Sequence, residues 1–313
     1  MRIAVPEQQF AERLRGLVAR GTDIVVWDPS DPASSTPAGP VEVVLLPDTV
    51  EPTVVRRLGD LEGLLAVQLQ SAGYDHIAGN IPPGVTVANG RGVHSDETAE
   101  WAVGLTIACL RGFPLYLRNQ GDRIWRVDTG RDFLAGRNVL VIGAGSIGTE
   151  IVNRLVPFRV TVTQAARTAR DGVIAVGDAI DRLPEYDVVI LIVPLTSSTR
   201  GLVDAAFLTR MKQGALLVNV ARGGVVDTGA LVAACASGRI SAALDVTDPE
   251  PLPSDHPLWE TPNVVLTPHV AGEQTRYSQD IALRLVAAQA EALQTGATIA
   301  NVVAGPAGHP IAV

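Results

Sequence analysis

Three ionisable side chains in the second half of the chain, Arg222, Glu250 and His269, each follow a short apolar, strand-like run of sequence. Histidine titrates near neutral pH, so it can give and take a proton. Arginine presents a planar fork of donors that matches a carboxylate and a neighbouring carbonyl oxygen. A glutamate beside the histidine can bind its second ring nitrogen, which fixes the tautomer and keeps the imidazolium populated. Together these residue types predict proton transfer to and from a bound small carboxylic acid.

Each of these residues also has an ordinary structural interpretation. A single arginine is usually a surface cation, a single glutamate a solvated side chain and a single histidine a satisfied structural residue. As a set they favour catalysis, because they occupy loops after consecutive strand-like segments, where catalytic groups concentrate.

The strand-like segment 138–142 runs directly into Gly143-Ala144-Gly145-Ser146-Ile147-Gly148, which fits the G-x-G-x-x-G pattern of a dinucleotide-binding turn. In this pattern Gly143 permits a tight turn, Gly145 lets the backbone approach a pyrophosphate, and Gly148 lets the next helix pack close to the strand. The helix that opens with Ser146 and Ile147 would direct its positive end at the phosphates. A tight turn without a ligand is the alternative, but the strand before it and the helix after it favour a dinucleotide.

The end of the second strand of this series bears on the choice of dinucleotide. A carboxylate about 20 residues beyond the first glycine usually binds the ribose hydroxyls of NAD. The chain has no carboxylate there and reads Gln164-Ala165-Ala166-Arg167-Thr168-Ala169-Arg170. Arg167 and Thr168, with Arg170 as a further candidate, could bind a 2′-phosphate through charge-assisted hydrogen bonds. The sequence therefore favours NADP(H) over NAD(H); the alternative is that the arginines are solvated and Gln164 binds the ribose.

Short apolar strands alternate with helical segments along the chain, which predicts an α/β protein with parallel sheets. Two such series follow one another, so we expect two doubly wound domains, a flavodoxin-like substrate domain and a Rossmann dinucleotide-binding domain, with a cleft between them. The substrate domain is predicted to be discontinuous, with residues 1–94 and 277–313, and the Rossmann domain to comprise residues 95–276. A helix over 278–293 is expected to pack on the first domain.

A long helical pattern from Ser95 to about Leu117 carries apolar residues on more than one face. Such a helix must be buried on several sides, which predicts a homodimer built on it. A core helix of the monomer is the alternative.

Composition argues against several other classes of protein. The net charge is −8 without a basic stripe, so a nucleic-acid partner is not expected. Apolar runs such as 188–193 are too short to cross a bilayer, and the N-terminus lacks the apolar stretch of a signal peptide. Cys109 and Cys235 lie in helical patterns, which indicates buried free thiols and a cytoplasmic protein. No C-x-x-C or H-E-x-x-H spacing occurs, so no metal site is predicted.

Four segments carry a resemblance to a known family. They are Val218-Asn219-Val220-Ala221-Arg222-Gly223-Gly224, Ala243-Leu244-Asp245-Val246-Thr247-Asp248-Pro249-Glu250-Pro251, Leu266-Thr267-Pro268-His269-Val270-Ala271-Gly272 and Ser71-Ala72-Gly73-Tyr74-Asp75-His76-Ile77. With the glycine turn, they resemble, in family order, the motifs of the D-isomer specific 2-hydroxyacid dehydrogenases, of the glyoxylate/hydroxypyruvate reductase type.

The resemblance implies hydride transfer between NAD(P)H and a small 2-oxo or D-2-hydroxy acid. It implies that His269 is the acid/base, Glu250 its partner and Arg222 the substrate clamp, with the backbone N–H groups of Ala72 and Gly73 on the substrate carboxylate. The cofactor-lining positions that it implies are Pro194, Thr199, Val220, Ala221 and, on the nicotinamide carboxamide, Asp245.

Other functions on the same fold remain open from the sequence. Formate dehydrogenases carry glutamine in place of the glutamate partner, so Glu250 argues against that reading. An NAD(P)-sensing, corepressor-like binding protein is an alternative from another class, although the chain lacks basic segments. Dehydrogenation of phosphite or another small anion is a further alternative, and the natural acid is undetermined, since a few cleft side chains decide it.

Overall fold

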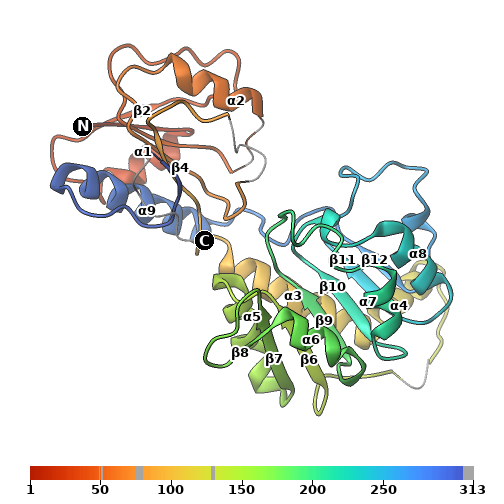
Figure 1. Cartoon of the computed structure of the whole chain (residues 1–313). Helices are drawn as coiled ribbons and strands as arrows, with labels where there is room; N and C mark the ends of the chain where they lie inside the picture. The colour runs from red at the N-terminus through yellow and green to blue at the C-terminus, as the bar shows by residue number, and fades with distance from the viewer. Residues whose placement is uncertain (49, 51, 75–79, 128–130, 306–313) are drawn as a thin grey trace. The chain divides into compact units, whose positions relative to one another are not determined.

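In the computed structural model the chain divides into two compact units, one of residues 1–94 with 274–313 and one of residues 95–273. The structure describes residues 1–48, 50, 52–74, 80–127 and 131–305. Each unit is built around its own sheet with helices on its faces (Figure 1), so the predicted α/β class is confirmed. The chain enters the first unit again at Gln274 rather than at residue 277.

The sheet of the first unit has the strand order β13-β5-β4-β3-β1-β2. Its strands are β1 (Arg2–Val5), β2 (Asp23–Val26), β3 (Val43–Leu45), β4 (Ala66–Gln68), β5 (Thr86–Ala88) and β13 (Val302–Ala304). The first five pair in parallel, and β13 pairs antiparallel with β5. The order of the parallel strands, 2-1-3-4-5, is that of flavodoxin-like folds.

Helices cover both faces of this sheet because its strands are apolar on both sides. Ile3 and Val5 of β1 face a core shared with α1 (Gln8–Leu14) and α9 (Arg276–Thr295). Ala4 between them faces the opposite core, to which α2 (Pro52–Arg57) contributes. A capping box formed by Thr275 and Ser278 starts α9, and Gly296 in the left-handed region ends it, which defines the predicted returning helix.

The sheet of the second unit is parallel in every described pairing, with the order β12-β11-β10-β9-β6-β7-β8. Its strands are β6 (Asn138–Ile142), β7 (Thr161–Ala166), β8 (Val173–Ala175), β9 (Val188–Leu191), β10 (Leu216–Asn219), β11 (Ser241–Leu244) and β12 (Val264–Leu266). Numbered within the unit, this order contains the Rossmann arrangement 3-2-1-4-5-6, which reverses between β6 and β9.

Two separate cores lie on the faces of this second sheet. One includes side chains of α3 (Ser95–Leu110) and α5 (Ser146–Leu155), which pack on each other. The other includes side chains of α6 (Val176–Asp181), α7 (Ala205–Arg210) and α8 (Thr228–Ala236).

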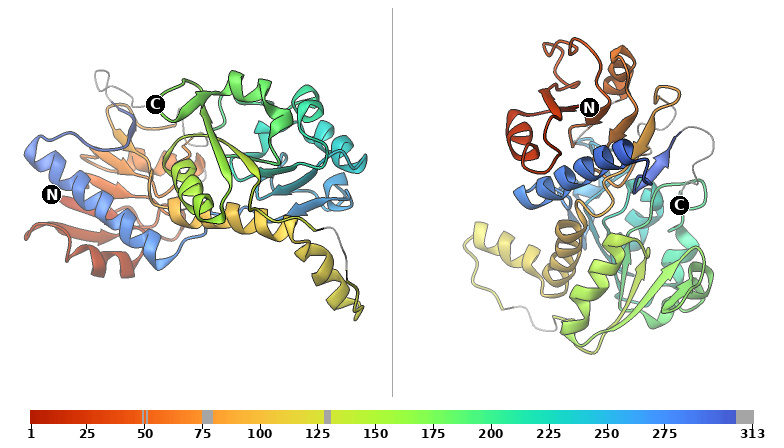
Figure 2. Two further views of the ribbon diagram at one scale, coloured as in Figure 1. Left: turned by 90° about the horizontal axis from the view of Figure 1, so that it is seen from below. Right: turned by 90° about the vertical axis from the view of Figure 1, so that its left-hand side faces the viewer.

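The helix predicted from Ser95 to about Leu117 is instead two helices, α3 and α4 (Phe113–Gly121). Gly112 lies between them with φ of 71°, a left-handed conformation that ends α3. The apolar side chains of α3 are buried or half-buried against a core of the second unit, and the predicted homodimer built on this helix stays a prediction. By contrast α4 extends away from the sheet of its unit (Figure 2) and has no buried residue. No helix in the described ranges is long and apolar enough to span a membrane.

Candidate active site

The glycine turn joins β6 to α5 at the point where the strand order of the second unit reverses (Figure 1). Gly143 has φ of 129°, and a Cβ atom there would lie 2.1 Å from the carbonyl oxygen of Ile192. A Cβ atom on Gly148 would lie 2.1 Å from the carbonyl oxygen of Gly143, so the helix can approach the strand only through glycine. A Cβ atom on Gly145 would meet nothing within 4 Å. The turn thus has two tightly packed glycines and one that faces open space.

The N-terminus of α5 is suited to an anion. Gly145 is its N-cap residue and offers no side-chain cap, so the first-turn N–H groups, which include those of Ser146 and Ile147, are not satisfied by a capping side chain. The positive end of the helix dipole adds to their attraction for phosphate. This arrangement fits the pyrophosphate of a dinucleotide.

The loop after β7 folds back towards the glycine turn. The side-chain amide of Gln164 donates to the carbonyl oxygen of Gly143 at 3.2 Å. Arg170 donates from Nη2 to the carbonyl oxygen of Ala144 at 2.6 Å. Arg167 and Thr168 lie between them and are exposed. Gln164 is therefore engaged with the turn itself, and the cationic and hydroxyl groups beyond it face solvent.

Arg222, Glu250 and His269 follow β10, β11 and β12, three neighbouring parallel strands. Because parallel strands end at the same edge of a sheet, their following loops meet there. Nδ1 of His269 lies 2.5 Å from Oε1 of Glu250. The Arg222 guanidinium donates to its neighbouring carbonyl, that of Ala221, at 2.8 Å. The structure thus brings together the three side chains that the sequence singled out.

The pair of His269 and Glu250 is electrostatically coupled. The hydrogen bond that Glu250 accepts from His269 raises the pKa of His269 above its ordinary value of 6.5, and burial opposes this shift. The same hydrogen bond lowers the pKa of Glu250 below 4.5, again against burial. The charge of Arg222 lowers both pKa values, which puts its guanidinium within electrostatic reach of the pair. Both pKa shifts therefore favour the imidazolium–carboxylate form of the pair over the neutral form.

Asp245 holds the turn that carries His269, a role that the sequence reasoning missed. Its side chain is buried and accepts from Thr267 Oγ1 at 2.6 Å and from the backbone N–H groups of Val270 and Ala271 at 3.1 and 3.0 Å. Its carbonyl oxygen accepts from the His269 N–H at 2.7 Å. His269 has φ of 56°, a left-handed conformation that non-glycine residues seldom adopt, so these bonds stabilise an unusual turn. The predicted contact of Asp245 with a carboxamide stays a prediction.

The other expected cofactor residues lie in loops after β9 and β10. Thr199 Oγ1 donates to the carbonyl oxygen of Pro194 at 2.6 Å, which closes the turn after β9. Val220 and Ala221 are buried, and the Ala221 N–H donates to the side chain of Asn219 at 3.0 Å. These four residues thus belong to the same edge of the sheet as the glycine turn.

Ala72 and Gly73 belong to the first unit, in the loop that follows β4, and both are half-buried. The remainder of the predicted substrate-loop motif, Asp75 to Ile77, lies outside the described residues.

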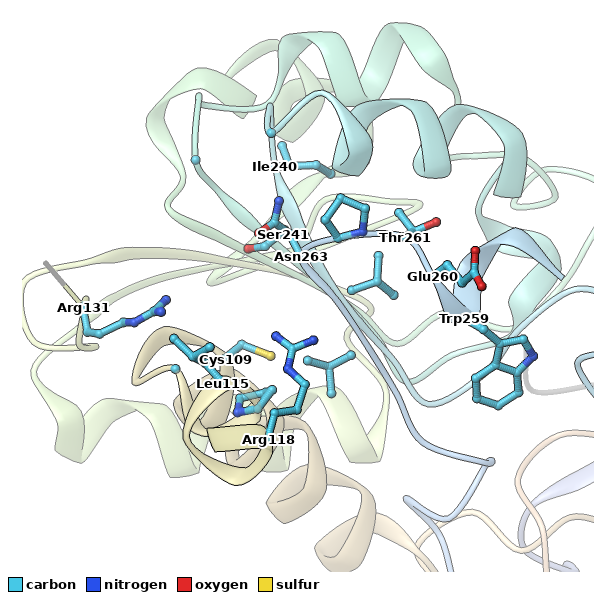
Figure 3. Close-up of a pocket in the computed structure, with 17 residues that line it drawn as sticks. Cys109, Leu115, Arg118, Arg131, Ile240, Ser241, Trp259, Glu260, Thr261 and Asn263 are labelled. Atoms are coloured by element: carbon cyan, nitrogen blue, oxygen red, sulfur yellow. The ribbon is translucent and has the colours of Figure 1, made fainter. Parts of the chain in front are cut away.

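A cavity of about 680 Å³ lies at the opposite edge of the second sheet, where β11 and β12 begin. Figure 3 shows side chains that line it, with Cys109, Leu115 and Arg118 facing Ser241, Asn263 and Thr261. No predicted site residue lines this cavity. Over the ranges that the structure describes, no group of three or more His, Cys, Asp or Glu residues could hold a metal ion.

Comparison with known proteins places this geometry in a family. The NAD binding domain of the D-isomer specific 2-hydroxyacid dehydrogenases matches residues 103–271. The chain is 33% identical to a human glyoxylate reductase/hydroxypyruvate reductase, across 86% of this chain and 88% of that one. It is 36% identical to a glyoxylate reductase of Thermofilum pendens, across 76% and 74% of the two chains.

Among solved structures, an NADPH-dependent glyoxylate/hydroxypyruvate reductase from Sinorhizobium meliloti, in complex with NADP and malonate, is 28% identical with a TM-score of 0.75. The match covers 100% of this chain and 99% of that one. The chain therefore belongs to the D-isomer specific 2-hydroxyacid dehydrogenase family, and the resemblance found in its sequence is confirmed. It is an NAD(P)-dependent oxidoreductase.

The coupling of His269 and Glu250 can be tested without any substrate. In an NMR titration, the imidazole of His269 should have a midpoint above 6.5. Glu250→Gln should lower that midpoint, because a neutral amide no longer favours the imidazolium. Glu260→Gln, at an exposed glutamate on the same unit, is the matched control and should leave the midpoint unchanged. If the midpoint of His269 is the same in Glu250→Gln as in the wild type, the coupling is contradicted.

Proposed function

We propose that the chain is an NADPH-preferring reductase of small 2-oxo acids of the glyoxylate and hydroxypyruvate type. The observation that carries this proposal is the hydrogen bond between His269 and Glu250 beside Arg222, at the sheet edge that also carries the glycine turn. The human and Thermofilum pendens relatives are named as glyoxylate or hydroxypyruvate reductases, which supports this substrate class.

In this proposal each residue of the set has a separate task. The Arg222 guanidinium binds the carboxylate and keto oxygens of the substrate through its planar fork of donors. Nδ1 of His269 is engaged by Glu250, so Nε2 gives a proton to the developing alkoxide. The bound nicotinamide supplies the hydride. Because Glu250 raises the pKa of His269, the imidazole keeps its proton to higher pH than a free histidine does, and reduction should decline as the pH rises through that pKa.

The substrate carboxylate is proposed to bind the backbone N–H groups of Ala72 and Gly73 in the first unit. Successive backbone N–H groups form a concavity that suits a carboxylate. No side-chain charge is needed for this contact.

The preference for NADPH rests on the loop after β7. Position 164 holds a glutamine, which donates to the glycine turn, where a carboxylate would repel a 2′-phosphate. Arg167 and Thr168 are exposed beside it and offer a cation and a hydroxyl. The Sinorhizobium meliloti relative holds NADP, which agrees with this choice.

Arg167→Ala should raise the KM for NADPH by about 10- to 100-fold, the loss expected for one charge-assisted hydrogen bond to phosphate. The KM for NADH should change little, since NADH lacks the 2′-phosphate. Steady-state rates with each cofactor measure both values. Arg182→Ala removes an exposed arginine elsewhere on the same unit and is the control. An equal effect on the two cofactors would refute the assignment of Arg167.

His269→Ala should reduce turnover of glyoxylate by about 10²- to 10⁴-fold, the usual contribution of a general acid. NADPH affinity, followed by fluorescence, should remain close to that of the wild type.

Initial rates with glyoxylate, hydroxypyruvate and pyruvate, each with NADPH and NADH, identify the preferred acid. A wild-type chain that binds NADPH but reduces none of them would favour a nucleotide-sensing protein, and oxidation of phosphite would favour the small-anion alternative.

We further propose that the chain forms a homodimer in a reducing compartment, the cytoplasm. Cys109 and Cys235 are free thiols. Because most apolar side chains of α3 pack within their own unit, we place the apolar surface for a second copy on α4 and the segment that follows it. Its exposed apolar side chains are Phe113, Leu117, Ile124, Trp125, Val127 and Phe133. Trp125 is 99% exposed, and a run of large apolar groups of this kind marks an interaction surface.

Trp125→Asp should convert a dimer into a monomer, because a carboxylate cannot be buried there without a partner. Sedimentation at several protein concentrations measures the change. Leu17→Asp replaces an exposed leucine of the first unit and should leave the dimer intact. A wild-type chain that sediments as a monomer would overturn the proposal.

A further inference from the structure

Three consecutive carbonyl groups of the loop at residues 71–73 accept hydrogen bonds, two from outside the loop and one from within it. The carbonyl oxygen of Ser71 accepts from the Gly90 N–H at 2.7 Å. That of Ala72 accepts from Nδ2 of Asn89 at 2.7 Å. That of Gly73 accepts from Oγ of Ser71 at 2.8 Å. The first two bonds come from the segment that directly follows β5, the strand next to β4.

These bonds also fix the direction of two N–H groups. In a trans peptide the N–H of one residue points opposite to the carbonyl of the residue before it. The carbonyls of Ser71 and Ala72 point at the segment 89–90, so the N–H groups of Ala72 and Gly73 point away from it. Within the described part of the chain, neither N–H donates a hydrogen bond to a protein acceptor. Two adjacent donors are therefore presented together, as a carboxylate requires.

Every polar group of Asn89 makes a hydrogen bond, and these bonds fix the position of the residue. Its N–H donates to the carbonyl oxygen of Asn301 at 2.9 Å, and its carbonyl oxygen accepts from the buried Gln68 side chain at 3.0 Å. Its Oδ1 accepts from the Arg91 N–H at 3.2 Å. With Oδ1 engaged in this way, the amide can turn only its donor towards the carbonyl of Ala72.

The next residue must be glycine for this contact to exist. A Cβ atom on Gly90 would lie 1.9 Å from the carbonyl oxygen of Gln70 and 2.9 Å from the backbone nitrogen of Ser71. No side chain fits in that space, so the segment 89–90 lies directly against the base of the loop. The sequence Asn89-Gly90 thus supplies one side-chain donor and one backbone donor at close range.

We infer that Asn89 is a positioning residue for the substrate: it orients the N–H groups of Ala72 and Gly73 that bind the carboxylate of the 2-oxo acid. This inference rests on the proposed function and extends it to a residue that touches the loop rather than the substrate.

The variant that tests the inference is Asn89→Asp. The carboxylate can still accept from the Arg91 N–H, but it places a negative oxygen against the carbonyl of Ala72. The peptide should turn away, and the KM for glyoxylate should rise by about 10- to 100-fold, since small misplacements of binding groups have effects of this size. The KM for NADPH should stay within about twofold of the wild-type value, because the glycine turn belongs to the second unit. Asn89→Ala removes the donor without adding charge and should cause a smaller rise in the same constant.

Asn301→Asp is the matched control. Asn301 donates from Nδ2 to the carbonyl oxygen of Arg91 at 3.1 Å, so this variant makes the same chemical change, with the same added charge, on a neighbouring carbonyl. Its φ of 57° is one that aspartate tolerates. Thermal unfolding by circular dichroism verifies that each variant is folded.

Oxamate, a carboxylate that is not reduced, separates the inference from the proposed function. Its affinity for the NADPH complex, measured by calorimetry, should fall in Asn89→Asp and persist in Asn301→Asp. If the wild type binds oxamate in this Asn89-dependent way yet reduces no 2-oxo acid, the reductase proposal fails and the inference stands. If Asn89→Asp and Asn301→Asp have equal oxamate affinity and equal KM for glyoxylate, the inference is overturned while the reductase proposal stands.

Discussion

Parallel pairing is the constraint on which the rest of the second unit depends. Because β6, β9, β10, β11 and β12 all run in one direction, every loop that follows them lies at one edge of the sheet. The glycine turn, the turn at Pro194, Arg222, Glu250 and His269 come from five such loops. Residues more than 100 positions apart in the sequence therefore converge without any long connection, and an antiparallel neighbour would have carried its loop to the other edge.

Convergence at one edge does not by itself give working geometry, which comes from hydrogen bonds that restrain each loop. Asp245 ties the turn around His269 to the end of β11 and holds it in a left-handed conformation. Glu250 then engages Nδ1 of the imidazole and raises the pKa of His269. In the first unit, hydrogen bonds from uncharged groups have the same effect, since Asn89 and Gly90 restrain the loop at Ala72. In both units, groups that do not touch the substrate restrain the groups that are proposed to bind it or to exchange a proton with it.

The sequence predicted the parts of this protein that local pattern controls. Alternating strands and helices gave both sheets, the glycine spacing gave the turn after β6, and Arg222, Glu250 and His269 stood at strand ends. Three features escaped prediction, of which the first is a local change of backbone conformation and the other two depend on neighbours in space. The break at Gly112 required a left-handed residue within an otherwise helical pattern. The antiparallel strand β13 depends on the free edge of β5. The restraint of Ala72 by Asn89 depends on the pairing of β4 with β5, which brings together loops 17 residues apart.

The loop after β7 differs from the histidine turn in what the fold asks of it. Arg167 and Thr168 face solvent and pack against no core, whereas the histidine turn makes four hydrogen bonds to Asp245, three of them to its buried carboxylate. Substitutions in the loop after β7 should leave the fold unchanged, while substitutions in the histidine turn must still satisfy the buried carboxylate of Asp245. On the proposed assignment of Arg167 and Thr168, a change of dinucleotide therefore needs substitutions only at exposed positions that do not support the histidine turn. The fold thus places the residues proposed to choose the electron source outside its cores, and the turn proposed to move the proton against a buried group.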